Sequence, residues 1–280
     1  MTTPEATTTP PSTPVPVVSF NGVGKTYANG FTAIRDVTFQ VDDAPDLKEI
    51  VSILGPSGSG KSTILRLIAG LAPQFPATMG EVLVLGKHVK GPGADRGMVF
   101  QDYTSFDNRT VLDNVAFGLE CAGIGVTERR ERAREWIGKV GLDVDNDAEK
   151  YPHQLSGGMR QRVAIARTLI LRPRIVLMDE PFGALDPRTR LNMQDLLVTL
   201  AHETQATVFF VTHSIEEAVY LGDRTLIIST APGTVLKDIH SPRPDFKARD
   251  MQRRPDFMAT VFEIRDIMEG LESSKRGGDD

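Results

Sequence analysis

The chain has 280 residues, of which 40% are hydrophobic and 25% are charged, a composition typical of an ordinary globular protein. Its formal net charge of −5 argues against a nucleic-acid partner, because such proteins usually present a basic face. A single cysteine, Cys121, excludes an internal disulfide bond and favours a reducing compartment. Residues 1–16 lack the apolar core of a secretory signal, and no later uncharged stretch is long enough to cross a bilayer.

The first hundred residues predict a tail followed by several strands and one helix. Residues 1–16 are rich in threonine and proline, so we expect them to be disordered. Apolar alternation and short apolar runs predict the strands, and apolar residues at helical spacing predict the helix. The strands lie within residues 17–27, 33–41, 50–54, 81–85 and 97–100, with a turn over 42–46 and a helix through 64–71.

Three helices are predicted in the middle of the chain. Thr110, followed three residues later by an acid, is a typical helix start. Thr127 precedes a second, charged helix whose apolar face includes Trp136. A third helix follows Ser156.

The second half of the chain predicts a parallel sheet. Residues 174–178, 207–211 and 225–228 are nearly continuous apolar runs, typical of strands buried on both faces. Helical patterns separate these runs, which indicates parallel βαβ units with right-handed crossovers. Apolar spacing over residues 257–271 predicts a last amphipathic helix. We expect it to dock on the chain's own surface, with a membrane-surface or partner role as the alternative.

The segment Gly-Pro-Ser-Gly-Ser-Gly-Lys-Ser at residues 55–62, the phosphate loop, matches G-x-x-x-x-G-K-[ST]. It lies between a predicted strand and a predicted helix, a context that disfavours a chance glycine-rich turn. The glycines let backbone N–H groups point inward, and the helix N-terminus adds further donors. Lys61 supplies a charge for the β- and γ-phosphates, and the Ser62 hydroxyl can ligate Mg²⁺. The residues expected to bind nucleotide here are Gly55, Pro56, Ser57, Gly58, Ser59, Gly60, Lys61, Ser62 and Thr63.

A second nucleotide signal is the apolar strand that ends in Asp179 and Glu180. Open α/β sheets bind ligands at the carboxyl edge of their strands. Adjacent strand residues point to opposite faces, so the two acids need different roles. Asp179 suits Mg²⁺ through its water shell, and Glu180 suits the attacking water as general base. A merely solvated acidic strand end is the alternative.

A third signal is Leu-Ser-Gly-Gly at residues 155–158, the signature segment, which opens a predicted helix. Such a helix start receives anions. Because the chain has only one phosphate loop, we expect Ser156, Gly157 and Gly158 to contact a nucleotide held by another copy.

With these residues in place, the chain resembles the ATP-binding subunit of an ABC transporter over about residues 17–240. The order phosphate loop, signature segment, acidic strand and histidine is that of the family. One departure is Met159, where the family usually has glutamine; we expect it to matter little. The resemblance implies an α/β fold with a P-loop NTPase core and parallel sheet, an N-terminal antiparallel β part and an inserted helical subdomain at about 103–172. Residues 241–280 would form a C-terminal tail with the amphipathic helix.

The resemblance also implies further site residues. Tyr27 resembles the aromatic residue that stacks on adenine, with a plain turn tyrosine as the alternative. Gln101 resembles the glutamine that touches Mg²⁺ and the attacking water, and the loop 102–106 after it would meet a membrane-embedded partner. Asp186 resembles the residue that crosses the dimer interface.

His213 resembles the histidine that holds the γ-phosphate and positions the water. It follows the predicted strand that ends near residue 212, and Ser214 with Glu217 is expected to cap the next helix. The resemblance therefore assigns catalytic roles to Glu180, His213 and Gln101, and Mg²⁺ contacts to Ser62, Gln101 and Asp179.

The family mechanism implies an ATPase with ATP and Mg²⁺ as cofactors, whose two head-to-tail copies sandwich two ATP molecules. Its partners would be a second copy, transmembrane permease subunits and, indirectly, a solute-binding protein, at the cytoplasmic face of the membrane. A soluble ABC-type ATPase of DNA repair or translation is an alternative, but the usual coiled-coil insertion or twin domain is not visible. A small-molecule kinase or GTPase is another, but neither needs the signature segment.

The direction of transport and the cargo rest on resemblance alone. The lack of a fused membrane segment fits importers better than exporters. Residues 100–103, 181–186 and 214–224 are similar to ATPases of nitrate, sulfonate and taurine importers. Import of a thiamine precursor or another small anion stays open, because selectivity lies in the binding protein and the permease.

Overall fold

The computed structural model describes residues 15–43, 49–102, 104–241 and 247–276. The predictions of a disordered tail over 1–16 and of a turn over 42–46 therefore lie mostly outside the described residues. Within them, no helix is both long and apolar enough to cross a membrane.

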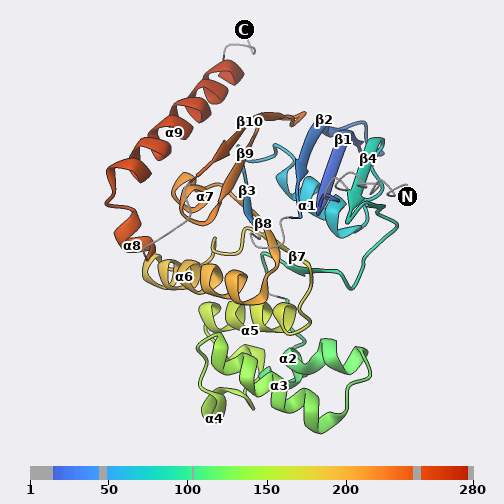
Figure 1. Cartoon of the computed structure of the whole chain (residues 1–280), viewed down its shortest axis with the longest axis vertical. Helices are drawn as coiled ribbons and strands as arrows, with labels where there is room; N and C mark the ends of the chain where they lie inside the picture. The colour runs from blue at the N-terminus through green and yellow to red at the C-terminus, as the bar shows by residue number, and fades with distance from the viewer. Residues whose placement is uncertain (1–14, 44–48, 103, 242–246, 277–280) are drawn as a thin grey trace, which may run out of the picture.

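An antiparallel sheet forms the N-terminal part of the molecule (Figure 1). Its strand order is β2-β1-β4-β5, and each neighbouring pair is antiparallel. Phe20 and Phe39 stack across two of the strands with their ring centroids 4.7 Å apart. The strands are β1 (Val18–Thr26), β2 (Thr32–Val41), β4 (Met79–Val84) and β5 (Lys87–His88).

The second sheet has six strands in the order β10-β9-β3-β8-β7-β6. The pairs from β9 to β6 are parallel, as the apolar runs predict, and β10 is antiparallel to β9. β10 was not predicted, because it is an edge strand with mostly exposed, polar residues. The strands are β3 (Ile50–Leu54), β6 (Arg96–Val99), β7 (Ile175–Asp179), β8 (Thr207–Thr212), β9 (Arg224–Ile228) and β10 (Val235–His240).

Alternate residues of the parallel strands enter two separate hydrophobic cores. Val51, Leu177 and Phe209 pack with α1 (Lys61–Ala69) and the antiparallel sheet. Val176 and Phe210 pack on the opposite side, with the remaining helices. The parallel sheet is therefore covered on both faces, which is why its strands read as continuous apolar runs.

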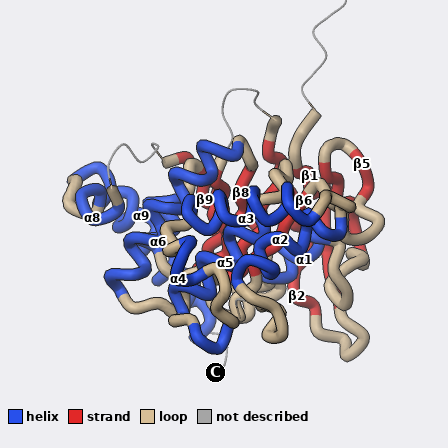
Figure 2. The backbone as a smooth tube through the Cα atoms, turned by 90° about the horizontal axis from the view of Figure 1, so that it is seen from below, coloured by secondary structure: helices blue, strands red, loops and turns tan. Residues whose placement is uncertain are grey.

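Helices α2 to α5 lie together at one end of the molecule, in the interval where we expect a helical subdomain (Figure 1). Seen from below, α2, α3 and α5 lie in front of the strands (Figure 2). The domain boundaries drawn from the sequence stay a prediction. The elements are α2 (Val111–Cys121), α3 (Val126–Lys139), α4 (Val144–Asp147), the 3₁₀ turn η1 (Pro152–Gln154) and α5 (Gly157–Leu169).

Two predicted helix starts are confirmed by their capping bonds. The Thr110 hydroxyl accepts from the backbone N–H of Asp113 at 3.2 Å, and the Ser156 hydroxyl accepts from that of Met159 at 3.3 Å. The start after Thr127 is wrong, because α3 begins at Val126 and follows a glycine with no side-chain cap.

The last helix lies on the chain's own surface. α9 (Pro255–Arg276) contacts α7 (Ile215–Leu221) and buries Phe257, Val261 and Ile264 against it and its neighbours. α8 (Ala248–Met251) contacts α6 (Pro187–Thr204), so the C-terminal part crosses two helices of the main body.

Candidate functional site

The phosphate loop joins the C-terminal end of β3 to the start of α1. Gly58 and Gly60 have φ angles of 80° and 87°, in the left-handed region that glycine adopts without strain. A Cβ atom on Gly60 would lie 2.4 Å from Ile34 Cγ2 and 2.9 Å from the Ala33 carbonyl oxygen. Only glycine fits this position, because the backbone of the loop packs closely against β2.

A cavity of about 300 Å³ opens over the phosphate loop. Its volume and its N–H-rich wall suit a bound phosphate chain. We call it the phosphate-loop cavity. Gly55 and Pro56 are not part of its lining and act through their carbonyls instead. Its lining residues are Tyr27, Phe31, Ala33, Ser57, Gly58, Ser59, Gly60, Lys61, Ser62, Thr63 and Glu180.

Lys61 is held inside the loop. Its Nζ atom donates to the carbonyl oxygens of Gly55 and Pro56, at 2.8 and 2.9 Å. Burial lowers the pKa of this ammonium, while the charges of Glu180 and Asp179 act to raise it. A phosphate in the cavity would supply a stronger acceptor than the two carbonyls.

Ser62, which lines the cavity, meets Asp179, which does not. The Ser62 hydroxyl donates to Asp179 Oδ1 at 2.8 Å, and Arg66 Nη2 lies 3.5 Å from Asp179 Oδ2. A hydroxyl and a buried carboxylate are the hard oxygen ligands that Mg²⁺ prefers. No group of three or more His, Cys, Asp or Glu residues suited to a metal occurs in the described part of the chain. The pair therefore fits a Mg²⁺ ion whose remaining ligands are phosphate oxygens and water.

Glu180 occupies the turn directly after β7 and lines the phosphate-loop cavity. Its φ angle is 46°, a left-handed conformation that is rare for a non-glycine residue. Its carboxylate Oε2 lies 3.5 Å from His213 Nδ1. The structure thus brings together two of the three residues expected to be catalytic, although 32 positions separate them in the sequence.

His213 follows β8 and exposes 63% of its side chain. The predicted cap of the next helix is present in one direction, because the Ser214 hydroxyl accepts from the Glu217 N–H at 3.2 Å. The second bond of a capping box, from the Ser214 N–H to the Glu217 carboxylate, is not formed, because that N–H donates to the Thr212 hydroxyl. The Glu217 carboxylate accepts from the Thr212 hydroxyl at 2.6 Å instead, which ties the helix to the end of β8.

Gln101 lies two residues beyond β6 and is exposed. Because β6 runs parallel to β7 with Val99 opposite Met178, Gln101 leaves the sheet at the same edge as Glu180. It does not line the phosphate-loop cavity in this chain. The role in binding Mg²⁺ and water therefore stays a prediction.

Tyr27 lines the cavity, and its hydroxyl lies 3.1 Å from the Thr63 hydroxyl. Phe31 stacks on it with the ring centroids 6.4 Å apart and is 49% exposed. Sequence reasoning missed Phe31. An aromatic side chain directly after the Asn29–Gly30 turn was the available signal.

The signature segment and Asp186 lie outside the phosphate-loop cavity. Ser156 caps α5, and a Cβ atom on Gly158 would lie 2.8 Å from Thr189 Cγ2, so the start of α5 packs against the start of α6. Asp186 caps α6 by accepting from the N–H groups of Arg188 and Thr189, both at 3.1 Å. Hydrogen bonding to Thr189 lowers the pKa of this carboxyl.

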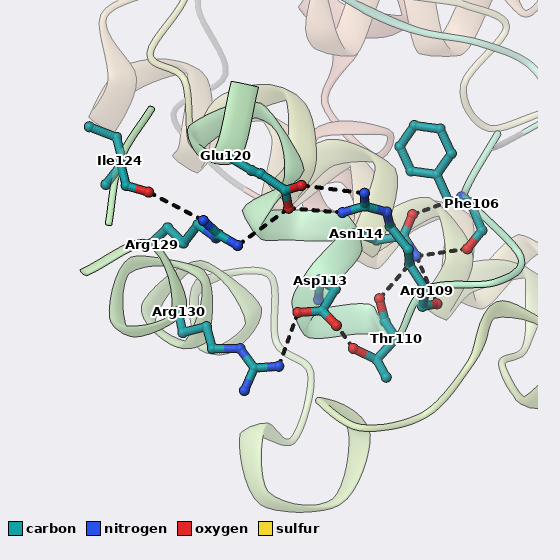
Figure 3. Close-up of polar contacts among 9 residues, drawn as sticks. All are labelled: Phe106, Arg109, Thr110, Asp113, Asn114, Glu120, Ile124, Arg129 and Arg130. Carbon is teal, nitrogen blue, oxygen red and sulfur yellow. Dashed lines mark hydrogen bonds and ion pairs between the residues drawn. The ribbon is translucent and has the colours of Figure 1, made fainter. Parts of the chain in front are cut away.

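The loop that leads from Gln101 to α2 is fastened by Asn114, as Figure 3 shows. Asn114 is fully buried, and its amide exchanges two hydrogen bonds with the backbone of Phe106, at 2.8 and 3.1 Å. It also donates to the carbonyls of Arg109 and Thr110 at 3.1 and 3.0 Å. A single side chain thus holds the second half of this loop, from Phe106 to Thr110.

A second, larger hollow of about 760 Å³ lies between β6, α2 and α5. Its wall is mainly apolar and includes the exposed Cys121. We call it the apolar groove. Its lining includes Phe100, Thr104, Phe117, Ala164, Arg167 and Leu171.

Comparisons with known proteins agree with this geometry. A family model described as ABC transporter matches residues 35–183. An uncharacterized ABC transporter ATP-binding protein of Methanocaldococcus jannaschii is 50% identical over 231 residues, 81% of each chain. A nitrate import ATP-binding protein of Synechocystis is 41% identical over 249 residues, 87% of this chain and 90% of that protein. A taurine import ATP-binding protein of Rhizobium johnstonii is 44% identical over 251 residues, 88% and 92%.

A solved structure gives the same result for the fold. It is the dimeric, post-hydrolysis state of an ATP-binding cassette bound to ADP and phosphate. Its chain is 35% identical and superposes with a TM-score of 0.68 over 80% of this chain and 99% of its own.

Proposed function

The chain belongs to the ABC transporter family, and from this premise we propose that it is the ATP-hydrolysing, energy-coupling subunit of an importer for a small anion. The observation that carries the proposal is the phosphate-loop cavity, which places Lys61, Ser62 and Glu180 around one space. Nitrate and taurine are the cargoes named for two relatives, and they support the choice of a small anion. Sulfonates and thiamine precursors are further cargoes to test.

In the proposed mechanism, the N–H groups of the phosphate loop and Lys61 bind the β- and γ-phosphates of ATP. Ser62 and Asp179 would hold Mg²⁺, with Gln101 as a further ligand, and the bound ion would supply positive charge next to the phosphates. Glu180 accepts a proton from the attacking water. His213, 3.5 Å from that carboxylate, orients the water and the γ-phosphate.

Two copies of the chain are needed for each hydrolytic site in this proposal. The signature segment does not line its own chain's phosphate-loop cavity, yet Ser156 and two glycines at a helix start form an anion-binding end. A head-to-tail dimer would place that end on the γ-phosphate bound by the partner copy. Tyr27 would stack on the adenine, and Asp186 would lie at the interface.

The apolar groove supports a permease as the membrane partner. Phe100 and Thr104, which flank the turn at Gln101, both line it. A short helix of a permease, apolar on one face, would fill such a groove and follow any movement of this turn. The chain would then lie peripherally on the cytoplasmic face of the membrane, with a solute-binding protein delivering cargo to the permease.

Glu180→Gln tests the catalytic assignment in the full-length chain. Removal of the base should lower kcat for Mg²⁺-dependent ATP hydrolysis by roughly 10²- to 10⁴-fold and should leave ATP binding intact. Glu131→Gln, an exposed change on α3, is the matched control and should keep wild-type turnover. Undiminished hydrolysis in homogeneous Glu180→Gln protein would remove Glu180 from this role.

The importer assignment has a separate test. The chain should co-purify with a polytopic membrane protein, and in liposomes that complex should hydrolyse ATP faster when a binding protein loaded with nitrate or taurine is added. ATP hydrolysis by a chain that associates with no membrane protein would point instead to a soluble ABC-type ATPase.

A further inference from the structure

Gln161 is a buried amide on the signature helix, one turn after Ser156. The residue is 0% exposed, and its Nε2 atom donates to the carbonyl oxygen of Pro181. Pro181 directly follows Glu180 in the chain. Gln161 thus joins the helix that carries the signature segment to the turn that carries the proposed base.

The turn at Glu180 needs external support. Its left-handed φ of 46° costs conformational energy that the surrounding structure must offset. On one side, the Glu180 N–H donates to the Val211 carbonyl at 3.1 Å. On the other side, Gln161 holds the Pro181 carbonyl. The direction of the Glu180 side chain therefore depends on both bonds.

The Gln161 amide is also incompletely satisfied. Its Oε1 atom is buried and has no hydrogen-bond partner among the described residues. An unpaired buried acceptor is unfavourable, and native proteins rarely keep one without another gain. An apolar side chain of similar size would avoid it. The gain here is the bond to Pro181.

We propose that Gln161 is a positioning residue that sets the place of Glu180 and ties it to the signature helix of the same chain. The inference rests on the proposed function, in which that helix contacts ATP held by the partner copy. A shift of α5 on engaging that ATP would then move Pro181 and with it the base. Each chain would thus couple ATP bound by the partner copy, which its own signature segment contacts, to the base at its own phosphate loop.

Gln161→Met is the first test. Methionine keeps the length of the side chain but removes the donor, so kcat for ATP hydrolysis should fall roughly 10- to 100-fold through misplacement of the base. The KM for ATP should stay unchanged. ATP-induced dimerisation, followed by size-exclusion chromatography in the Glu180→Gln background, should also persist, because the signature segment is untouched.

Val163→Ala on the same helix is the matched control. Val163 is buried in the core and its side chain has no hydrogen-bond donor, so its truncation reports the effect of loosening α5 without loss of a hydrogen bond. Its kcat should stay near that of the wild type at a temperature where both variants are folded, as checked by thermal melting. An equal loss of kcat in both variants would overturn the proposal.

Gln161→Glu gives a second test, whose expected pH dependence a purely structural role of Gln161 would not produce. Burial favours the neutral acid, which can donate to the Pro181 carbonyl, whereas the ionised form cannot. The ratio of variant to wild-type kcat should therefore fall as the pH rises from about 6 to about 8.5, over the range where buried glutamates titrate. A ratio that does not change with pH, or wild-type kcat in Gln161→Met, would refute the positioning role. Wild-type protein with no ATPase activity would instead refute the proposed function.

Discussion

At the scale of single residues, the site is made from side chains held under constraint. Lys61 is bound by two loop carbonyls, Ser62 by Asp179, and Glu180 by a left-handed turn. Their hydrogen bonds and backbone geometry set most of these orientations within this chain alone. Binding of ATP would therefore exchange existing contacts, such as those of Lys61, more than it would order new side chains.

The buried Glu217 leads to a prediction about pH. Burial raises the pKa of its carboxyl, against the hydrogen bond from Thr212 and the charges of Arg190 and His213. The folded protein thus holds this proton more tightly than the unfolded chain. That contribution to stability is full below the unfolded pKa and is lost as the pH rises through the folded pKa.

Glu217→Gln keeps an acceptor for Thr212 but cannot ionise. Relative to the wild type, this variant should therefore be more stable at pH 8 than at pH 5, with a larger free energy of unfolding. Urea denaturation at the two pH values measures the difference, with the exposed Glu131→Gln as control. A difference that is the same at both pH values would contradict the buried-acid explanation.

At the scale of elements, the loop from Thr104 to Thr110 is fastened to two helices. Asn114 of α2 holds it by accepting from the Phe106 N–H and by sharing its two amide N–H groups among the carbonyls of Phe106, Arg109 and Thr110. Arg167 of α5 donates to the Thr104 carbonyl at 3.0 Å, and its guanidinium lies 4.2 Å from the centroid of the Phe106 ring. The part of the loop nearest the apolar groove is therefore held by α2 and α5.

Asn114→Ala tests this fastening. It removes the acceptor of the Phe106 N–H and the amide donor to the carbonyls of Phe106, Arg109 and Thr110, so we expect a loss of about 1–3 kcal/mol in the free energy of unfolding. Urea denaturation measures it. Asn146→Ala on α4 is the control, because that side chain is exposed and its loss should cost within about 0.5 kcal/mol. Equal effects of the two changes would show that Asn114 does not hold the loop.

At the scale of the whole molecule, the two helix starts that we propose to contact phosphate, those of α1 and α5, lie at separate places. The start of α1 faces the phosphate-loop cavity, and the start of α5 does not. In the proposed function, a single chain would therefore offer half of one site and half of another, which a second copy in head-to-tail arrangement would complete.

Ser156→Arg tests whether α5 acts on the partner's nucleotide. The monomer should bind ATP with wild-type affinity, measured by equilibrium titration, because Ser156 does not line the cavity. Turnover of the dimer should fall roughly 10²-fold or more, because the arginine blocks the start of α5, which would otherwise stabilise the charged phosphate in the transition state. Lys61→Ala is the contrasting variant, which should lose affinity in the monomer itself. Loss of monomer binding in Ser156→Arg would disprove the arrangement in trans.

The sequence by itself determined the features that depend on neighbouring residues. The phosphate loop, the caps at Thr110, Ser156 and Ser214, and the buried character of β3, β7 and β8 all follow from short patterns, because turn chemistry and continuous apolar runs are local. These patterns, with the resemblance they carry, were enough to predict the fold class and the family.

Only the tertiary structure decided which distant residues meet. Asp179 reaches Ser62 because α1 contacts β7, and Glu180 reaches His213 because β7 pairs with β8. Gln161 of α5 reaches Pro181, in the segment between β7 and α6, because α5 contacts α6. β10 was likewise invisible in the sequence, because an exposed edge strand is stabilised by pairing with β9 more than by an apolar face. The order of strands in a sheet is fixed by packing between segments far apart in the chain, and no local periodicity encodes it.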